Sequence, residues 1–294
     1  MPVGDAALTA SSAGGRRVGY DGGVLHLRAD GCEASIHPDV GGRLGQLDLG
    51  DGPLLRGPDE DLGWAEWGYY PLLPWSNRIP DGHLVFGTID SRLPVNWSDG
   101  SAIHGLAAAT PWTVRSSSET TAELVVEAEV GPYRVRGEQS FDLRPDELRL
   151  RLGVVNAGDS AVPGGIGIHP WFRAGRVRVP AELKWPGDPL PTGPPIPVAA
   201  ADDLRAGAVP PPMDRCFTGL TDTVAEVPGL RLRWDGPVTQ VVVFSGEPGW
   251  VAVEPVTMAN DGFGLAERGI PGHGVQVLEP GGDLEVTYRF ERRR

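Results

Sequence analysis

Cysteine, lysine and long apolar runs are nearly absent from this sequence. Its 294 residues include only Cys32 and Cys216, and two distant thiols can build neither a cysteine-rich zinc site nor a disulfide framework. The single lysine, Lys184, lies in a proline-rich run, which weighs against Schiff-base or pyridoxal phosphate chemistry. No stretch approaches the roughly 18 apolar residues of a membrane-spanning helix. These absences favour a reduced, cytoplasmic protein that is not embedded in a membrane.

Basic residues are also scarce. The 26 Lys and Arg are outnumbered by 39 Asp and Glu, which gives a net charge of -13. Because nucleic acid is bound through clustered positive charge, we expect no nucleic-acid partner. A Gly-x-x-x-x-Gly-Lys loop is missing, so a P-loop nucleotide site is excluded. The first 17 residues are polar and lack the apolar core of a signal peptide, and we expect them to be a disordered tail.

Glycine and proline, in contrast, are abundant. The 42 glycines and 29 prolines make up about a quarter of the chain, roughly twice the usual share, which disfavours long helices. Where a period can be read, it is two: Leu148, Leu150 and Leu152 alternate with arginines, as in a half-buried strand. Further strands are predicted at residues 24–28, 123–130, 133–143, 230–234, 240–245, 250–254, 274–278 and 283–291.

These strands predict an all-β fold. So many short strands, with no helical period over three turns, indicate a large antiparallel β-sandwich in which each sheet buries one face. Residues 180–212 are rich in proline, and we interpret them as a long surface excursion rather than a linker, because patterned strands lie on both sides. Residues 18–294 are therefore predicted to form one domain.

The segment from Tyr70 to Gly82 is the first of several that combine polar and aromatic residues. Asn77 and Arg78 follow Trp75 between two prolines, which places a five-donor guanidinium beside an aromatic ring on a stiff backbone. Sugars suit both groups, since their hydroxyls accept hydrogen bonds and their C–H faces stack on aromatic rings. A structural turn with a surface arginine is the alternative interpretation.

Two histidines have distinctive neighbours. His104 precedes a glycine, which lets a ligand or another backbone segment approach closely. His169 lies in the stretch GIGIHPWFR, where a proline fixes the local backbone and Trp171 and Phe172 supply an aromatic wall. Each histidine taken alone fits a packed structural residue as well as a catalytic or binding one.

Two acidic residues complete the candidate set. Glu254 ends an apolar run directly before a proline, and apolar surroundings would raise the pKa of its carboxyl towards that of a general base. A strand-end carboxylate that points into solvent is the alternative. Asp214, in MDRCFTG, has the oxygens to accept hydrogen bonds from a polyol or to cap a turn.

In chain order these segments resemble the aldose 1-epimerase (mutarotase) family. The resemblance runs from Leu72 to Phe290 and rests on LLPWSNRIPDGHLVFG, IHGLAAATPW, GIGIHPWF, MDRCFTG, VAVEPVTMANDGF and VQVLEPGGDLEVTYRF. It implies a large twisted antiparallel β-sandwich, the galactose mutarotase-like supersandwich, with a sugar cleft across one concave sheet. It also implies a monosaccharide substrate and a reaction that needs neither metal nor cofactor.

The resemblance implies roles for single residues as well. His169 corresponds to the family's general acid and Glu254 to its general base. Positions that contact the sugar correspond to Arg78, Asn77, His104 and Asp214, and Trp171 is expected to bind the substrate beside them. After the base, this chain reads PVTMANDGF where galactose mutarotases commonly carry Thr-Gln and then Pro-Asp-Ala, so the identity of the sugar stays open.

Two other functions fit a related fold. Arg173, Arg176 and Arg178 could clamp a phosphate, which would make the protein a hexose-phosphate 1-epimerase. A sugar-binding or sensor protein would keep the cleft without the chemistry, although binding alone does not require an acid and base pair. The expected oligomeric state is a monomer or a homodimer.

Two further interpretations use the same polar residues differently. His104, His169 and Glu254 could form a metal site, although the usual close spacing of two ligands on one strand is missing. A glycosidase would use two opposed carboxylates, for which Glu254 and Asp214 are available. The histidine-centred pattern favours epimerisation.

Overall fold

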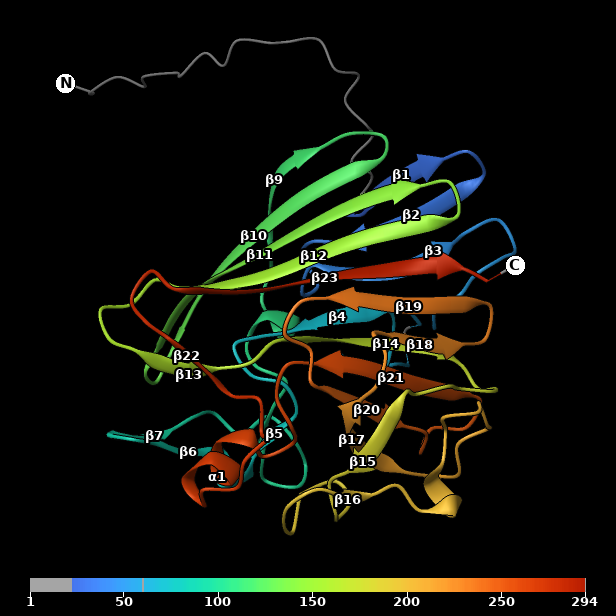
Figure 1. The fold of residues 1–294 in the computed structure, drawn as a ribbon. Helices are drawn as coiled ribbons and strands as arrows, with labels where there is room; N and C mark the ends of the chain where they lie inside the picture. Colours follow the sequence, from blue (N-terminus) through green and yellow to red (C-terminus); the bar gives the residue numbers. More distant parts are fainter. Residues whose placement is uncertain (1–22, 60, 294) are drawn as a thin grey trace, which may run out of the picture.

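Two large antiparallel sheets packed face to face form most of the structure, a computed structural model that describes residues 23–59 and 61–293 (Figure 1). In spatial order, the ten-stranded sheet consists of β1 (Leu25–Ala29), β2 (Cys32–His37), β3 (Arg43–Asp48), β4 (Tyr69–Leu72), β14 (Gly167–Arg173), β21 (Trp250–Val256), β20 (Gln240–Phe244), β17 (Asp214–Leu220), β15 (Ala181–Lys184) and β16 (Ile196–Pro197). The seven-stranded sheet consists of β18 (Val224–Val227), β19 (Leu230–Asp235), β23 (Asp283–Arg292), β12 (Glu147–Asn156), β11 (Tyr133–Arg144), β10 (Thr121–Val130) and β9 (Thr113–Ser117). The predicted all-β antiparallel sandwich is confirmed, whereas the predicted disordered tail, residues 1–17, lies outside the described residues.

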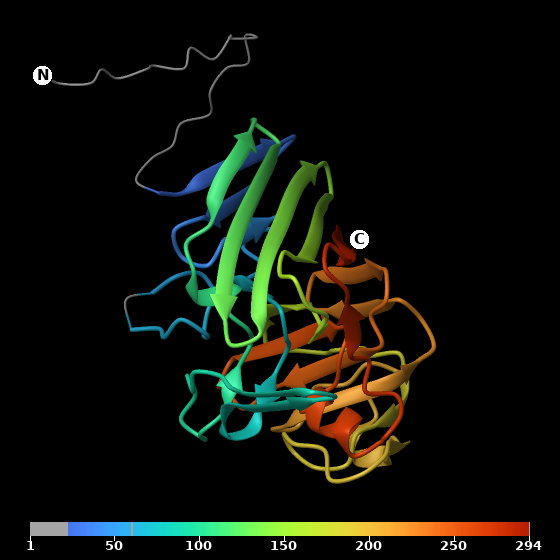
Figure 2. The ribbon, with the colours of Figure 1, turned by 90° about the vertical axis from the view of Figure 1, so that its left-hand side faces the viewer.

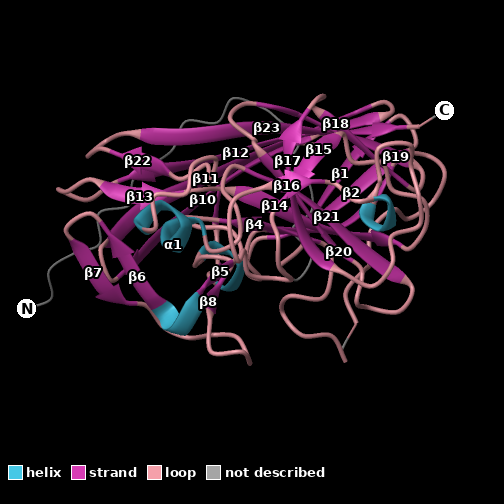
Figure 3. Ribbon diagram, turned by 60° about the horizontal axis from the view of Figure 1, so that its bottom comes forward, coloured by secondary structure: helices cyan, strands magenta, loops and turns pink. Residues whose placement is uncertain are grey.

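Smaller elements lie at the edges of the sandwich. Three two-stranded sheets are formed by β13 (Val162–Gly164) with β22 (Gln276–Leu278), β5 (Arg78–Ile79) with β8 (Ala102–Ile103), and β6 (His83–Phe86) with β7 (Ile89–Arg92). Within the described part of the chain, helical structure is limited to α1 (Gly262–Glu267) and the 3-10 turns Pro80–Gly82, Ala107–Ala109 and Ala200–Asp202 (Figure 3). Across residues 23–59 and 61–293, no helix is long and apolar enough to cross a membrane.

The main hydrophobic core lies between the two sheets. Leu148, Leu150 and Leu152 of β12 are fully buried there, as their alternation with arginines predicts, and Leu150 pairs with Tyr288 of β23. Figure 2 shows the green strands of the seven-stranded sheet stacked against the blue strands of the ten-stranded sheet. The arginines that alternate with these leucines lie on the outer face of the seven-stranded sheet. Strands of this sheet therefore need apolar residues only on the face that packs in the core.

In the middle of the ten-stranded sheet, the strands are buried on both faces. Ile168 and Phe172 of β14 point into the core between the sheets, whereas His169 and Trp171 belong to the opposite face. The prediction that Trp171 and Phe172 form one aromatic wall is therefore wrong. Successive side chains of a strand point to opposite faces of the sheet, so only Trp171 lies on the same face as His169.

Two sequence-based boundaries need correction. β21 continues through Pro255 to Val256, so Glu254 lies inside a strand rather than at its end, because proline removes a backbone donor without changing the extended path. Residues 180–212 are not only a surface excursion, since β15 pairs with β17 at the sheet edge and Trp185 is buried. Burial of that indole explains why the segment joins the sheet.

Candidate active site

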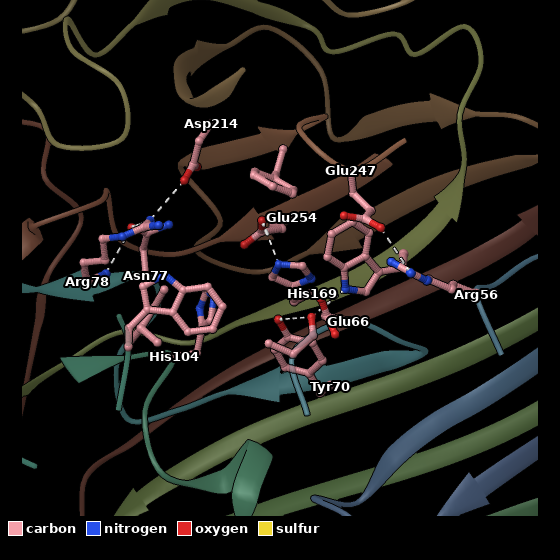
Figure 4. Close-up of a pocket in the computed structure, with 15 residues that line it drawn as sticks. Arg56, Glu66, Tyr70, Asn77, Arg78, His104, His169, Asp214, Glu247 and Glu254 are labelled. Atoms are coloured by element: carbon pink, nitrogen blue, oxygen red, sulfur yellow. Dashed lines mark hydrogen bonds and ion pairs between the residues drawn. The ribbon is translucent and has the colours of Figure 1, made fainter. Parts of the chain in front are cut away.

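A pocket opens on the outer face of the ten-stranded sheet (Figure 4). Its floor is built by neighbouring strands. On β4 and β14, Tyr70 pairs directly with His169. Between β14 and β21, Gly167 pairs with Val256 and Trp171 with Ala252, a register that places His169 opposite Glu254. Because directly opposed side chains share a face, the antiparallel pairing itself brings the predicted acid and base together.

His169 and Glu254 are in contact and almost completely buried. The Nε2 atom of His169 lies 3.3 Å from Oε1 of Glu254, and their side chains are 6% and 3% exposed. The other polar atoms of the pair, Nδ1 of His169 and Oε2 of Glu254, have no hydrogen-bond partner among the described residues. Because an unsatisfied buried polar group costs about 1–3 kcal/mol, hydrophobic packing alone does not explain this pair.

Burial favours the uncharged form of both groups. It lowers the pKa of His169 to about 3, with Arg43 and Arg78 acting in the same direction and the backbone of His169 against it. It raises the pKa of Glu254 well above the usual value, with the Asp214 carboxylate adding to the rise and Arg78 opposing it. At pH values between the two shifted pKa values, the pair carries one titratable proton, which His169 and Glu254 share.

The lowered pKa of His169 predicts a loss of stability in acid. The unfolded chain protonates this residue near its usual pKa of 6.5, whereas the folded protein does so only at about 3. Between these values the unfolded state binds more protons, so the free energy of unfolding falls as the pH decreases from about 6.5. Urea denaturation at pH 7 and pH 5 should show a smaller decrease for His169→Asn than for the wild type. An equal decrease would contradict the shift, and the exposed His26→Asn is the control.

The guanidinium of Arg78 is fixed at one end of the pocket. Nη1 lies 3.1 Å from Oδ2 of Asp214 and donates to Oδ1 of Asn77 at 3.2 Å, while Nε lies 2.9 Å from Oδ2 of Asp99. The structure therefore brings Asn77, Arg78 and Asp214 together as predicted. Sequence reasoning missed Asp99, since an aspartate in a Gly- and Ser-containing loop has no signal that separates it from an ordinary turn residue.

His104 reaches the pocket through an unusual backbone. His104 and Gly105 both adopt left-handed conformations, with φ of 62° and 71°, and the amide of His104 donates to the carbonyl of Asn77 at 2.9 Å. The ring centroid of His104 then lies 5.2 Å from that of His169. Burial lowers the pKa of His104 well below the usual value, and the charges of His169 and Arg78 lower it further. This histidine is thus a neutral neighbour of His169.

We predict that Gly105→Ala disrupts this part of the site. A Cβ atom at this position would lie 2.0 Å from the carbonyl oxygen of Leu73, a backbone atom that cannot move aside. The left-handed backbone alone costs about 1–3 kcal/mol for a non-glycine residue, and the overlap adds to this cost. Thermal unfolding measures the loss against Gly269→Ala, which has φ of 67° and open space around its Cβ. Equal losses in the two variants would show that the close approach to Leu73 is unimportant.

The opposite end of the pocket is aromatic and carries a second ion pair. Trp171 and Phe244 line it, and their ring centroids are 5.6 Å apart. Arg56 and Glu247 also line this end, with Nη2 of Arg56 3.3 Å from Oε1 of Glu247. Figure 4 shows this pair and the Arg78–Asp214 pair on opposite sides of His169 and Glu254. Sequence reasoning predicted Trp171 but not Arg56, Phe244 or Glu247.

Tyr70 is another pocket residue that the sequence analysis did not single out. Its ring stacks on the imidazole of His169, with centroids 4.6 Å apart and planes inclined by 15°. Burial raises the pKa of its phenol well above the usual value, so the hydroxyl stays protonated. Tyr70 stands at the start of the Tyr70–Gly82 segment, but the sequence alone does not distinguish a tyrosine that lines a pocket from one in the hydrophobic core.

The three arginines proposed as a phosphate clamp do not line this pocket. The guanidinium carbon of Arg173 lies 5.4 Å from the centroid of a Trp250 ring, Arg176 donates to the carbonyl of Gly207, and Nη1 of Arg178 lies 3.7 Å from Asp222. β14 ends at Arg173 and the chain then leaves the sheet, so their side chains are occupied elsewhere. The described part of the chain also holds no group of three or more His, Cys, Asp or Glu that could bind a metal ion.

The fold and the pocket together define the class of galactose mutarotase-like β-sandwich proteins. The structure superimposes with a TM-score of 0.81 on a putative aldose 1-epimerase from Escherichia coli K12, at 23% identity, covering 92% of this chain and 98% of that one. It superimposes with a TM-score of 0.79 on a galactose mutarotase-like protein from Clostridium acetobutylicum, at 22% identity, covering 92% and 95%. At these identities the likeness shows the fold.

The family follows from the sequence. The sequence model of the aldose 1-epimerase family matches residues 23–281, and the chain belongs to this family. Among curated proteins, it is 34% identical over 139 residues to the uncharacterised protein YphB of Escherichia coli K12, covering 45% of this chain and 47% of YphB. It is 31% identical over 168 residues to the uncharacterised protein YihR of the same organism, covering 55% and 54%. These matches thus span about half the length of each curated relative.

Proposed function

We propose that the protein is an aldose 1-epimerase that interconverts the α and β anomers of a free aldose. The observation that carries the proposal is the buried contact between His169 and Glu254 at the floor of a pocket lined by polar and aromatic side chains. An acid and a base on adjacent strands can act on two neighbouring oxygens of one small ring.

The proposed reaction needs one proton donor and one acceptor. The step starts from the form of the pair in which the shared proton lies on His169 and Glu254 is a carboxylate. Glu254 removes the proton from the C1 hydroxyl while the imidazolium of His169 protonates the ring oxygen O5, so the C1–O5 bond breaks, an open-chain aldehyde forms and the pair is left with its proton on Glu254. Rotation about C1–C2 presents the other face of the carbonyl, and the same two groups then run in reverse to close the opposite anomer. The proton held by the pair is enough for this cycle, since each turnover returns it.

Five further residues are proposed to bind the sugar. Arg78, Asn77 and Asp214 offer donors and acceptors to hydroxyl groups at one end of the pocket, and His104 lies beside the acid. Trp171 offers an indole face for the C–H surface of the ring. Their position around the acid and base pair supports these roles.

Catalysis explains the pair better than binding alone does. A sugar-binding or sensor protein does not require an acid and a base in direct contact at the pocket floor, as His169 and Glu254 are. A glycosidase would need a second free carboxyl, but Asp214 is engaged by Arg78 while the group next to Glu254 is a histidine.

A free sugar fits the pocket better than a hexose phosphate. Both arginines that line the pocket are already paired with carboxylates: Arg78 with Asp99 and Asp214, and Arg56 with Glu247. We predict that glucose has a kcat/KM at least about tenfold higher than glucose 6-phosphate, because a phosphate would meet these carboxylates without a free cation. Polarimetry on both compounds measures the ratio, and a preference for the phosphate would favour the hexose-phosphate alternative.

Polarimetry on freshly dissolved α-glucose, α-galactose and other aldoses tests the proposed function itself. The expected result is an acceleration of mutarotation on at least one free aldose. Acceleration of none of them, together with measurable sugar binding, would favour the sugar-binding alternative.

The proposed setting is the cytoplasm, with residues 18–294 as one domain that acts as a monomer or homodimer. Both cysteines, Cys32 and Cys216, are free and buried, which supports a reducing compartment. Size-exclusion chromatography with light scattering measures the oligomeric state directly.

A further inference from the structure

Arg43, at the start of β3, is a completely buried arginine without a carboxylate partner among the described residues. Its guanidinium is held by backbone carbonyls instead. Nη1 donates to Trp67 at 3.0 Å, Nη2 donates to Trp64 at 2.7 Å and to Ala108 at 3.4 Å, and Nε donates to Val40 at 2.9 Å. The guanidinium carbon also lies 4.3 Å from the centroid of the Trp67 ring.

A buried cation of this kind is not explained by stability. Removing a charge from water is costly, and carbonyl dipoles compensate it less fully than a carboxylate does. Burial lowers the pKa of Arg43 only to about 10, so the side chain is charged at neutral pH. A role in the site is the better explanation, because two of the four carbonyls that Arg43 binds belong to the segment whose Ala65 and Glu66 line the pocket.

That segment, residues 64–67, is here called the pocket wall. Arg43 binds the carbonyls at both of its ends, those of Trp64 and Trp67. In between, the carbonyl of Ala65 accepts two hydrogen bonds, from the Tyr70 hydroxyl at 3.2 Å and from the Trp171 indole at 2.8 Å. The wall therefore connects the buried cation to two aromatic side chains on β4 and β14.

These two aromatic side chains hold the imidazole of His169. Tyr70 stacks on it at a centroid distance of 4.6 Å, and Trp171 contacts it at 5.2 Å with the planes inclined by 45°. The Nδ1 atom of His169 has no hydrogen-bond partner among the described residues. A catalytic histidine is commonly oriented by a bond to that second nitrogen. In this site the imidazole is instead held by the packing of Tyr70 and Trp171, together with the His104 ring and the contact of Nε2 with Glu254.

We propose that Arg43 is a positioning residue for His169 and acts through the pocket wall. It fixes residues 64–67, the Ala65 carbonyl fixes the rings of Tyr70 and Trp171, and these rings orient the imidazole towards the substrate oxygen. The inference rests on the proposed function of His169 as the acid. It predicts that loss of Arg43 impairs the chemical step more than sugar binding, because no atom of Arg43 lines the pocket.

Two substitutions test the role of Arg43. Arg43→Lys keeps the charge but cannot reach the same set of carbonyls, and Arg43→Met removes both charge and donors. We expect kcat for mutarotation to fall by about 10- to 100-fold in each, with KM changed by less than about threefold, since a small misplacement of a catalytic group has effects of this size. A fall confined to KM, or no fall in either constant, would overturn the proposal.

A matched control separates positioning from a loss of stability. Leu47 lies on the same strand and is fully buried in the core between the sheets, away from the pocket wall. We expect Leu47→Ala to lower the unfolding midpoint while kcat at 20 °C is unchanged. If kcat of Leu47→Ala falls as much as that of Arg43→Lys at equal stability, the effect of Arg43 is a general one and the proposal fails.

A double-mutant cycle tests the connection through Ala65. Tyr70→Phe keeps the stacked ring and removes the hydroxyl that bonds to the Ala65 carbonyl. If both residues act through the pocket wall, the effect of Tyr70→Phe on kcat is smaller in the Arg43→Lys background than in the wild type. Full additivity would overturn the connection.

Histidine NMR distinguishes failure of this inference from failure of the proposed function. The Hε1 and Hδ2 signals of His169 report the ring current of the stacked Tyr70, whether or not the protein accelerates any reaction. We expect these shifts to move in Arg43→Lys and to stay in Leu47→Ala. An inactive wild type with this result would reject the epimerase proposal alone, whereas unmoved shifts in Arg43→Lys would reject the positioning role.

Discussion

Replacing Glu254 by glutamine is expected to lower kcat for mutarotation by about 10² to 10⁴-fold, the usual contribution of a positioned general base. Glutamine has nearly the same shape, so it fills the space on β21, but it cannot accept the proton of the C1 hydroxyl. The loss should appear in kcat and kcat/KM together, because the base acts only as the reaction proceeds.

The same substitution is expected to stabilise the fold at neutral pH. Burial raises the pKa of Glu254 above the usual value of 4.5. Between pH 4.5 and this raised pKa, the folded state keeps a proton that the unfolded chain releases. The stability contributed by this carboxyl is therefore present below pH 4.5 and lost as the pH rises through that interval. Glu254→Gln has no such titration, which makes activity and stability change in opposite directions.

Polarimetry and urea denaturation at pH 5 and pH 8 measure the two effects on one protein sample. The exposed Glu119→Gln is the control for the loss of a single negative charge. An active Glu254→Gln variant would show that another group is the base, whatever its stability.

Replacing His169 by asparagine is the second substitution with a large expected effect, again about 10² to 10⁴-fold in kcat. Asparagine removes the Nε2 atom that lies 3.3 Å from Glu254, which is the proposed proton donor to the ring oxygen. Because the stacking surface for Tyr70 is also lost, we expect the variant to be the less stable of the two at pH 8.

The double variant Glu254→Gln with His169→Asn shows whether the two residues act as one unit. Groups that share one proton transfer cycle are strongly non-additive, so the double variant is expected to be no slower than the slower single variant. Effects that multiply would indicate independent roles, with the acid or the base supplied from elsewhere in the pocket.

Sequence patterns predicted most of the long strands of the fold. β12 was found because leucines alternate with arginines, and β19 and β23 were found in the same way. β4 and β14 are buried on both faces, carry no polar period and were not found. β20 and β21 are buried in the same way but were predicted from their runs of valine and other apolar residues. Of the strands at the pocket floor, those that carry Tyr70 and His169 were thus missed, whereas the strand that carries Glu254 was predicted.

The predicted site residues came from local chemistry and from family resemblance. Asn77, Arg78, His104, His169 and Glu254 each stand in a distinctive segment, and all of them line one pocket. Asp99, Arg56 and Arg43 carry no comparable local signal. Each was identified only from its contacts in the structure. Asp99 pairs with the guanidinium of Arg78, Arg56 lies near two indole rings, and Arg43 donates to four backbone carbonyls.

The amino-acid sequence by itself determined the class of fold, the family and the types of residue that could carry acid and base chemistry, because these depend on periodicity and short motifs. Only the tertiary structure decided that His169 faces Glu254, since strand register, and not distance along the chain, sets which side chains meet. It also decided their protonation, because burial from several elements at once shifts both pKa values in opposite directions.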